Sequence, residues 1–392
     1  MPDQPGPRRQ TEIFMEGMAD VTPDVPISYE ALEEAALAAL DSDAYDYVAG
    51  GAGSEAAVSH NRVAFEQWRL HPRQPCDVAD RDLSVELLGR ELPAPVCLAP
   101  VGVQTILHEE GELASARAAA DLELPFTMSS AASETLEDVA DELGDAPGWF
   151  QLYWPSDRAI AESFVDRAED AGYEAIVVTV DTPMLAWRER DRHDAFLPFL
   201  DGEGIANYVE DPAFRDRLDV PPEENELAAI QEFVDVFGNP SLTVEDVGWL
   251  CDRTDLPVVV KGVLHGADAT ALVEAGADAI WVSNHGGRQV DRAVAALDAL
   301  PAVAAAVGDR VPVVFDSGIR RGADVLVALA LGADAVAVGR PYAYGLAVDG
   351  TNGVRTVLEN LLADLDLTLG LCGRPTVAEV DRDLLVRAGP LG

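Results

Sequence analysis

Short runs of apolar residues recur along this chain, and each run is too short to form a helix. The predicted strands are 96–102, 126–130, 149–153, 175–183, 256–261, 279–282, 311–316 and 335–340. Segments that favour helices separate them, at 111–122, from 135, 157–171, 244–251, 267–275, 295–307 and 323–331. Near-continuous apolar strands alternating with helices indicate a parallel sheet covered on both faces. Eight such units in about 250 residues predict a closed (β/α)8 TIM barrel.

The remaining segments set the domain organisation. Residues 1–27 are rich in proline and are expected to form a loose arm, whereas 28–392 are expected to form one domain. That domain begins with a helical segment from residue 29, and a polar insertion of 184–242 after the fourth strand is expected to act as a loop or lid. An open doubly wound sheet is the alternative fold, but no G-x-G-x-x-G motif follows the first strand.

The charge balance excludes several classes of partner. The chain has 70 acidic and 27 basic residues, for a net charge of −43. Such a protein repels nucleic acid and anionic membranes. The acids are spread along a chain that still contains regular apolar runs, which favours a folded halophilic protein in a salt-accumulating cytoplasm. No secretion signal or spanning segment is recognised, and four widely spaced cysteines suggest no metal site.

Polar residues or glycines stand at the carboxyl end of every predicted strand. In a TIM barrel these ends share one mouth, so the whole ring predicts a ligand site there. The set comprises Gly102, Ser129, Gln151, Tyr153, Thr179, Asp181, Lys261, Ser283, Asn284, His285, Arg288, Asp316, Gly318, Arg320, Gly339 and Arg340. The alternatives are a core histidine, a helix cap for Asp181 and surface ion pairs for the arginines.

The residue types indicate the ligand. Glycine and arginine after the last two strands suit a phosphate dianion. Lys261 is the only lysine in the chain, and it supplies a compact point charge rather than a planar fork. Together with the hydrogen-bonding groups upstream, it fits the edge of a flat heteroaromatic ring. A phosphorylated flavin satisfies both halves of the site.

Several of these motifs resemble the FMN-dependent L-2-hydroxy-acid oxidase/dehydrogenase family, in order, from residue 28 to the C-terminus. They are Phe150-Gln151-Leu152-Tyr153, Thr179-Val180-Asp181-Thr182-Pro183, Val260-Lys261-Gly262, Ser283-Asn284-His285-Gly286-Gly287-Arg288-Gln289, Asp316-Ser317-Gly318-Ile319-Arg320 and Gly339-Arg340-Pro341. Within the family the likeness is closest to the lactate 2-monooxygenases, on the strength of Ala99-Pro100-Val101-Gly102, the long insertion and the segment 339–345.

The resemblance implies a role for each matching residue. His285 would be the base, Asp181 would orient it, and Arg188 with Arg288 would bind the substrate carboxylate. Tyr47 and Tyr153 would add hydrogen bonds to the substrate. Lys261 would lie by flavin N1–O2. The other residues implied to contact FMN are Pro100, Val101, Gly102, Ser129, Gln151, Thr179, Ser283, Asp316, Gly318, Arg320, Gly339 and Arg340.

The expected activity is oxidation of a small L-2-hydroxy acid, with L-lactate as the first candidate and oxygen as acceptor. If pyruvate and peroxide stay together under the lid, a lactate 2-monooxygenase results, giving acetate, CO2 and water. If they escape, the enzyme is an oxidase, and another acceptor would make it a dehydrogenase. A non-redox FMN barrel such as a type 2 isopentenyl diphosphate isomerase, or a catalytically silent scaffold protein, is the alternative of another class.

The family also implies a homo-oligomer, a tetramer or octamer. Ala131 stands where related plant enzymes often carry an aromatic residue.

Overall fold

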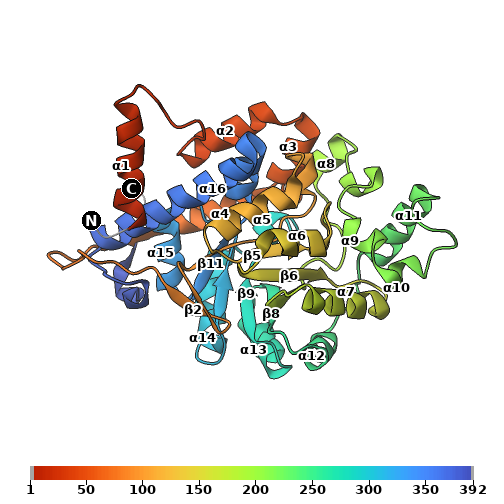
Figure 1. Ribbon diagram of the computed structural model, residues 1–392. Helices are drawn as coiled ribbons and strands as arrows, with labels where there is room; N and C mark the ends of the chain where they lie inside the picture. The colour runs from red at the N-terminus through yellow and green to blue at the C-terminus, as the bar shows by residue number, and fades with distance from the viewer. Residues whose placement is uncertain (1–3, 390–392) are drawn as a thin grey trace.

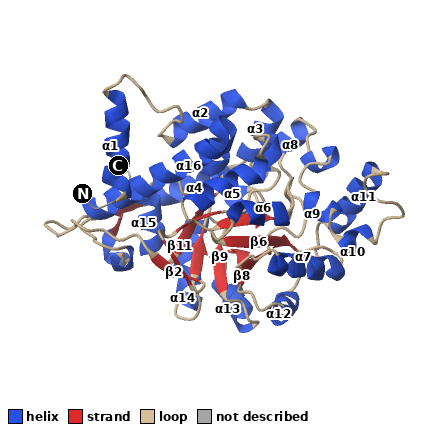
Figure 2. Cartoon of the chain, viewed as in Figure 1, coloured by secondary structure: helices blue, strands red, loops and turns tan. Residues whose placement is uncertain are grey.

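The computed structural model describes residues 4–389 and confirms the TIM barrel (Figures 1 and 2). Eight parallel strands close in chain order, because β11 pairs with β4. They are β4 (Val96–Leu98), β5 (Phe126–Ser129), β6 (Gly148–Tyr153), β7 (Ala175–Thr179), β8 (Val258–Val263), β9 (Ala279–Val282), β10 (Val313–Phe315) and β11 (Ala335–Val338). Each strand is shorter than or close to its predicted range, and the predicted polar residues lie near the carboxyl ends of the strands or in the loops that follow them.

The predicted helices form the outer layer of the barrel, as Figure 2 shows around the central strands. They are α5 (Gly111–Asp121), α6 (Leu136–Leu143), α7 (Arg158–Asp170), α12 (Val244–Arg253), α13 (Gly266–Glu274), α14 (Ala296–Val307), α15 (Gly322–Ala330) and α16 (Arg340–Leu371). Helix α16 has a kink at Asp349 and Gly350, where the backbone leaves helical dihedral angles. The predicted helix in the tail from residue 353 is its second part.

The barrel interior is a separate apolar core. Trp149 and Trp281 meet edge to face there, with ring centroids 6.3 Å apart. A hairpin of β2 (Val85–Leu87) and β3 (Arg90–Leu92) packs Leu87 and Leu92 against these inward-facing residues. This hairpin precedes β4 and covers the amino ends of the strands, so the site must open at their carboxyl ends.

The N-terminal region differs from the expected loose arm. Helix α1 (Pro5–Gly17) packs against α16, and the Gly6 N–H donates to the buried carboxylate of Asp366. A Cβ at Gly6 would lie 2.6 Å from Leu367, so glycine permits this close approach. Prolines in the first turn of a helix are tolerated, which is why proline content misled the sequence-based prediction. The predicted helical segment follows as α2 (Tyr29–Ala39), α3 (Ser42–Ala49) and α4 (Ala56–Glu66).

The insertion 184–242 carries short helices. They are α8 (Glu189–His193), η2 (Pro198–Asp201), α9 (Ala206–Val209), α10 (Pro212–Arg215) and α11 (Glu226–Val236). Their core is aromatic: Tyr208 packs against Phe164 of α7 and Phe233 of α11, each at 4.9 Å between centroids. Asn207 fixes the segment to the barrel by accepting from the Leu136 N–H. In Figure 1, α10 and α11 lie at the opposite side of the barrel from α1.

One further pair was not predicted: β1 (Trp68–Leu70) pairs antiparallel with β12 (Leu385–Arg387), close to the C-terminal end of the described chain. Across residues 4–389 no helix is both long enough and apolar enough to cross a membrane.

Candidate active site

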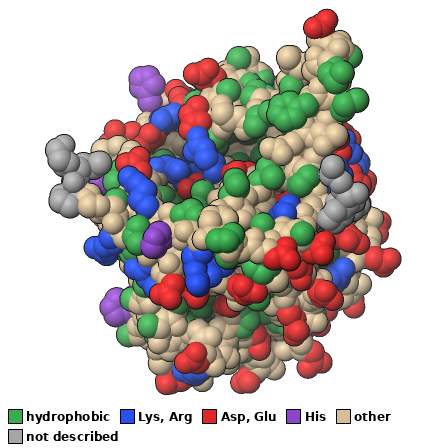
Figure 3. All heavy atoms as spheres, turned by 90° about the vertical axis from the view of Figure 1, so that its left-hand side faces the viewer, with side chains coloured by type: hydrophobic (Ala, Val, Ile, Leu, Met, Phe, Trp, Pro, Cys, Tyr) green, Lys and Arg blue, Asp and Glu red, His purple; other side chains and the backbone are tan. Residues whose placement is uncertain are grey.

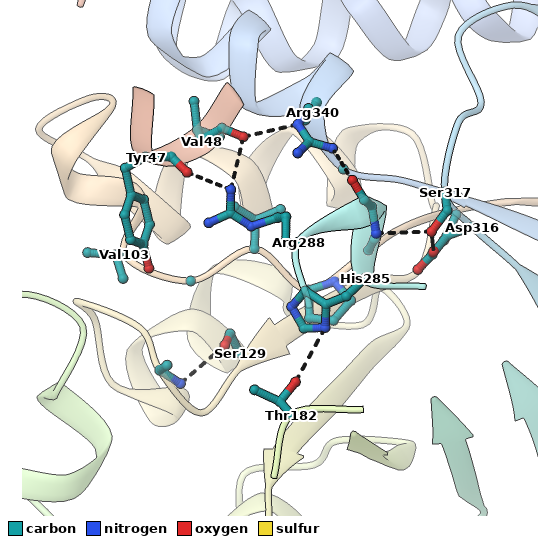
Figure 4. A pocket seen from close by; sticks show the side chains of 18 of the residues that line it. Tyr47, Val48, Val103, Ser129, Thr182, His285, Arg288, Asp316, Ser317 and Arg340 are labelled. Atoms are coloured by element: carbon teal, nitrogen blue, oxygen red, sulfur yellow. Dashed lines mark hydrogen bonds between the residues drawn. The ribbon is translucent and has the colours of Figure 1, made fainter. Parts of the chain in front are cut away.

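A cavity opens at the carboxyl ends of the barrel strands (Figure 4). Its empty volume is about 1160 Å³ including the open mouth, which is sufficient for a nucleotide-sized cofactor together with a small acid. Residues at or just after the carboxyl ends of all eight barrel strands line it, together with residues of α3 and the insertion. Five basic side chains converge on its wall: Arg188, Lys261, Arg288, Arg320 and Arg340.

His285 and Asp181 form a partly buried pair, as the sequence predicted. His285 follows β9 and Asp181 follows β7, and their Nδ1 and Oδ1 atoms are 2.9 Å apart. The Tyr153 hydroxyl lies 3.5 Å from the other imidazole nitrogen, Nε2. A carboxylate at Nδ1 favours the tautomer that carries its proton there, so Nε2 is the nitrogen free to accept a proton.

The protonation states support this assignment. Burial lowers the pKa of His285, although Asp181 opposes the shift, so the imidazole is neutral at pH 7. Burial alone would raise the pKa of Asp181, but His285 and then Lys261 bring it below its ordinary value. Asp181 therefore stays ionised, and it stabilises the imidazolium that forms when His285 accepts a proton.

Arg188 and Arg288 lie together on one side of the cavity. The Arg188 Nε donates to the Arg288 carbonyl at 3.2 Å, and its Nη1 lies 3.7 Å from Asp191. Arg288 donates to the carbonyl oxygens of Tyr47, at 2.6 Å, and Gly50, at 2.9 Å. Burial and then the charge of Arg188 lower the pKa of Arg288, so this pair gains from an anion placed between them.

The two predicted tyrosines also reach the cavity. Tyr47 lies on α3, and the Arg288 guanidinium sits over its ring at 5.2 Å. Tyr153 ends β6, stacks against His285 at 6.4 Å and contacts Phe237 of the insertion at 5.3 Å. Burial raises the pKa of Tyr153, so its hydroxyl keeps its proton and can donate a hydrogen bond.

Lys261 is buried beside an acidic partner. Its Nζ donates to the Ser283 hydroxyl at 3.2 Å and lies 3.5 Å from Asp316 Oδ2. Ser317 belongs to the same cluster and was missed by the sequence reasoning, because a serine inside Asp316-Ser317-Gly318 looks like a turn residue. Its positive φ of 78° is unusual for a non-glycine residue. Only coordinates reveal that signal.

A chain of hydrogen bonds links the neighbouring strands β5, β6 and β7. The Ser129 hydroxyl donates to Gln151 Oε1 at 3.0 Å, and the Gln151 amide donates to Thr179 Oγ1 at 2.9 Å. Ser129 lines the cavity, whereas Gln151 and Thr179 are buried at the adjacent strand ends without being part of its wall. Ser283 and Asp181 are likewise set behind the wall residues that they contact.

The wall fits a phosphorylated flat cofactor. A Cβ at Gly102 would lie 2.2 Å from the Ala131 carbonyl, so the loop after β4 passes unusually close to the loop after β5. Pro100, Val101, Gly318 and Gly339 line the cavity around it. The buried Nε of Arg320 has no hydrogen-bond partner among the described residues, although its guanidinium lies over the Tyr29 ring. A buried N–H without a partner on a charged guanidinium suits a phosphate oxygen.

Arg340 is used differently from Arg320. Its three nitrogens donate to the carbonyl oxygens of Val48, Gly286 and Gly50, at 3.1, 3.0 and 2.7 Å. It joins α3 to the loop that carries His285 (Figure 4). Two N–H groups remain for an anion, so Arg320 is the better placed of the two for the predicted phosphate contact. Among the described residues no cluster of histidine, cysteine or carboxylate groups could hold a metal ion.

Comparisons with known proteins agree with this site. The model of the FMN-dependent dehydrogenase family matches residues 36–387. An L-lactate oxidase of Lysinibacillus sphaericus is 43% identical over 362 residues, covering 92% of this chain and 93% of that one. The 2-hydroxyacid oxidase 1 of Mus musculus is 41% identical, covering 92% and 96%.

A solved structure of mandelate oxidase matches with a TM-score of 0.82 and 40% identity, covering 93% of this chain and 98% of that chain. The chain therefore belongs to the FMN-dependent α-hydroxy-acid dehydrogenase and oxidase family, and it is an FMN-dependent oxidoreductase that acts on 2-hydroxy acids.

Proposed function

We propose that this enzyme oxidises a small L-2-hydroxy acid, with L-lactate as the first candidate, and releases the 2-oxo acid. Oxygen is the acceptor: one 2-hydroxy acid and one O2 give one 2-oxo acid and one hydrogen peroxide. The observation that carries the proposal is the 2.9 Å His285–Asp181 pair, whose free Nε2 faces a cavity that also holds two arginines.

The residues divide the work as follows. Arg188 and Arg288 bind the substrate carboxylate and fix its Cα, and such orientation can contribute on the order of 7–11 kcal/mol. The Tyr153 hydroxyl donates to the substrate oxygen. His285 Nε2 accepts the hydroxyl proton, and Asp181 stabilises the resulting imidazolium. Bound FMN supplies the two-electron acceptor for this oxidation. Lys261 places a positive charge in the cavity wall, where it would favour an electron-rich ring.

The fate of the product separates the two versions of the reaction. The related proteins reported above are named as oxidases, so they favour release of the 2-oxo acid over the lactate 2-monooxygenase reaction expected from the sequence motifs. The aromatic core of the insertion leaves Phe199 and Phe237 in the cavity wall, and how long product stays beneath them decides between the two outcomes.

The test is a product assay with L-lactate under oxygen. The oxidase reaction predicts pyruvate and hydrogen peroxide in equal amounts. Acetate and CO2 as the main products would contradict it and restore the monooxygenase assignment. Catalase should be present in a parallel sample, because free peroxide decarboxylates pyruvate in solution and would mimic the second result.

Gel filtration of the same preparation tests the proposed homo-oligomer, and fractionation of the source cells tests the proposed cytoplasmic location.

A further inference from the structure

The loop that carries His285 has an unusual backbone. His285, Gly286 and Gly287 have φ values of 59°, 63° and 80°, so three successive residues lie in the left-handed region. Such a conformation is strained for a histidine and persists only where the surroundings impose it. Something must therefore hold this loop against the barrel.

Two serine hydroxyls do so. Ser317, which follows β10, accepts the N–H of Asn284 at 3.3 Å and the N–H of Gly286 at 3.0 Å. Ser283 accepts the N–H of His285 at 3.0 Å. Three consecutive backbone donors of the loop are thus satisfied by two side chains (Figure 4 draws the bond that Ser317 accepts from Gly286).

Both hydroxyls donate to one oxygen. Ser283 and Ser317 each lie 2.6 Å from Asp316 Oδ1, while Asp316 Oδ2 faces the Lys261 ammonium. A hydroxyl has one donor and two acceptor sites, so Ser317 uses its full capacity. The carboxylate orients both hydroxyl protons away from the loop, which leaves their lone pairs free for its N–H groups.

Ser317 is itself strained, with its φ of 78°. Glycine would adopt this angle without cost, so a serine here is explained by its hydroxyl rather than by its backbone. We propose that Ser317 is a positioning residue that holds residues 284–286 against Asp316 and thereby aims the imidazole of His285 into the cavity. The expected effect of Ser317 on catalysis rests on the proposed function, whereas its hydrogen bonding to the loop does not.

The test compares Ser317→Ala and Ser317→Gly. Both lose the hydroxyl, but only glycine relieves the strain, so Ser317→Gly should melt at a higher temperature than Ser317→Ala. Because a displaced His285 is no longer aligned with the substrate hydroxyl, kcat for L-lactate should fall about tenfold in both variants. KM should stay near the wild-type value, since Arg188 and Arg288 are untouched.

Hydrogen–deuterium exchange of the FMN-loaded enzyme without substrate supplies a readout independent of turnover. Exchange of the peptide containing residues 284–287 should rise in both variants, because two of its N–H groups lose their acceptor. Glu123→Gly is the matched control, since Glu123 has a φ of 53° on an exposed turn after α5. It should leave kcat and exchange at 284–287 unchanged.

The proposal is overturned if Ser317→Gly keeps both wild-type kcat and wild-type exchange, or if activity follows melting temperature across the two variants. If the wild-type enzyme oxidises no 2-hydroxy acid, the proposed function fails, whereas the exchange comparison still decides whether Ser317 holds the loop.

Discussion

The cavity and the outer surface of this protein have opposite charge. Five basic side chains line the cavity, and Asp316 is the only carboxylate among the described residues of its wall. The chain as a whole carries 43 more negative than positive charges, and acidic side chains crowd the lower right of the face in Figure 3. Buried charges act individually, because little water screens them, whereas exposed charges act collectively through a field that salt removes.

Replacement of His285 should have the largest effect. His285→Gln keeps the size and polarity of the side chain but removes the base, so the rate of flavin reduction by L-lactate should fall by about 10²–10⁴. Anaerobic stopped-flow absorbance measures this rate. FMN content should match the wild type, and a variant that reduces its flavin at the wild-type rate would show that another group accepts the proton.

Loss of one cavity arginine should come next. Arg188→Leu removes a charged hydrogen-bond donor to the substrate, worth about 1.5–3 kcal/mol, so kcat/KM for L-lactate should fall by roughly 10–100-fold. Arg188 is chosen because Arg288 also holds the backbone of α3. The surface control is Arg253→Leu, whose partner is Asp166. Equal losses of kcat/KM in the Arg188 and Arg253 variants would contradict the distinction between individually acting cavity charges and collectively acting surface charges.

The pH dependence follows from the neutral state of His285. Burial lowers the pKa of His285 below about 6.5. Since only the neutral imidazole accepts a proton, kcat/KM should be flat at neutral pH and should be lost as pH falls through this lowered pKa. A pH profile of initial rates measures it. An acidic limb centred above pH 7 would show that the pKa is raised instead.

Salt should have the smallest effect per charge, but it acts over the whole surface. Raising KCl from 0.01 to 1 M shortens the screening length from about 30 Å to about 3 Å. Self-repulsion among the acids then weakens, so the melting temperature should rise, as the proposed halophilic origin requires. The on-rate of an anionic substrate should rise as well. A melting temperature that falls with KCl would contradict this account of the surface.

The sequence predicted the barrel because each strand is a continuous apolar run, and it predicted the strand-end residues because a parallel barrel gathers those ends. It missed β2–β3 and β1–β12, since three-residue strands of mixed polarity have no period to detect. Arg188 and Tyr47 lie outside the predicted strands, and only the family resemblance pointed to them. Ser317 required backbone angles and hydrogen bonds, which residue types alone do not contain.

Arg188, Arg288 and His285 are expected to bind an L-2-hydroxy acid in the orientation in which FMN oxidises it. Anaerobic mixing of the FMN-loaded enzyme with L-lactate or D-lactate, followed by visible flavin absorbance, shows whether they do. L-lactate should bleach the flavin and D-lactate should not. Absence of bleaching with L-lactate, glycolate and L-mandelate alike would contradict this expectation.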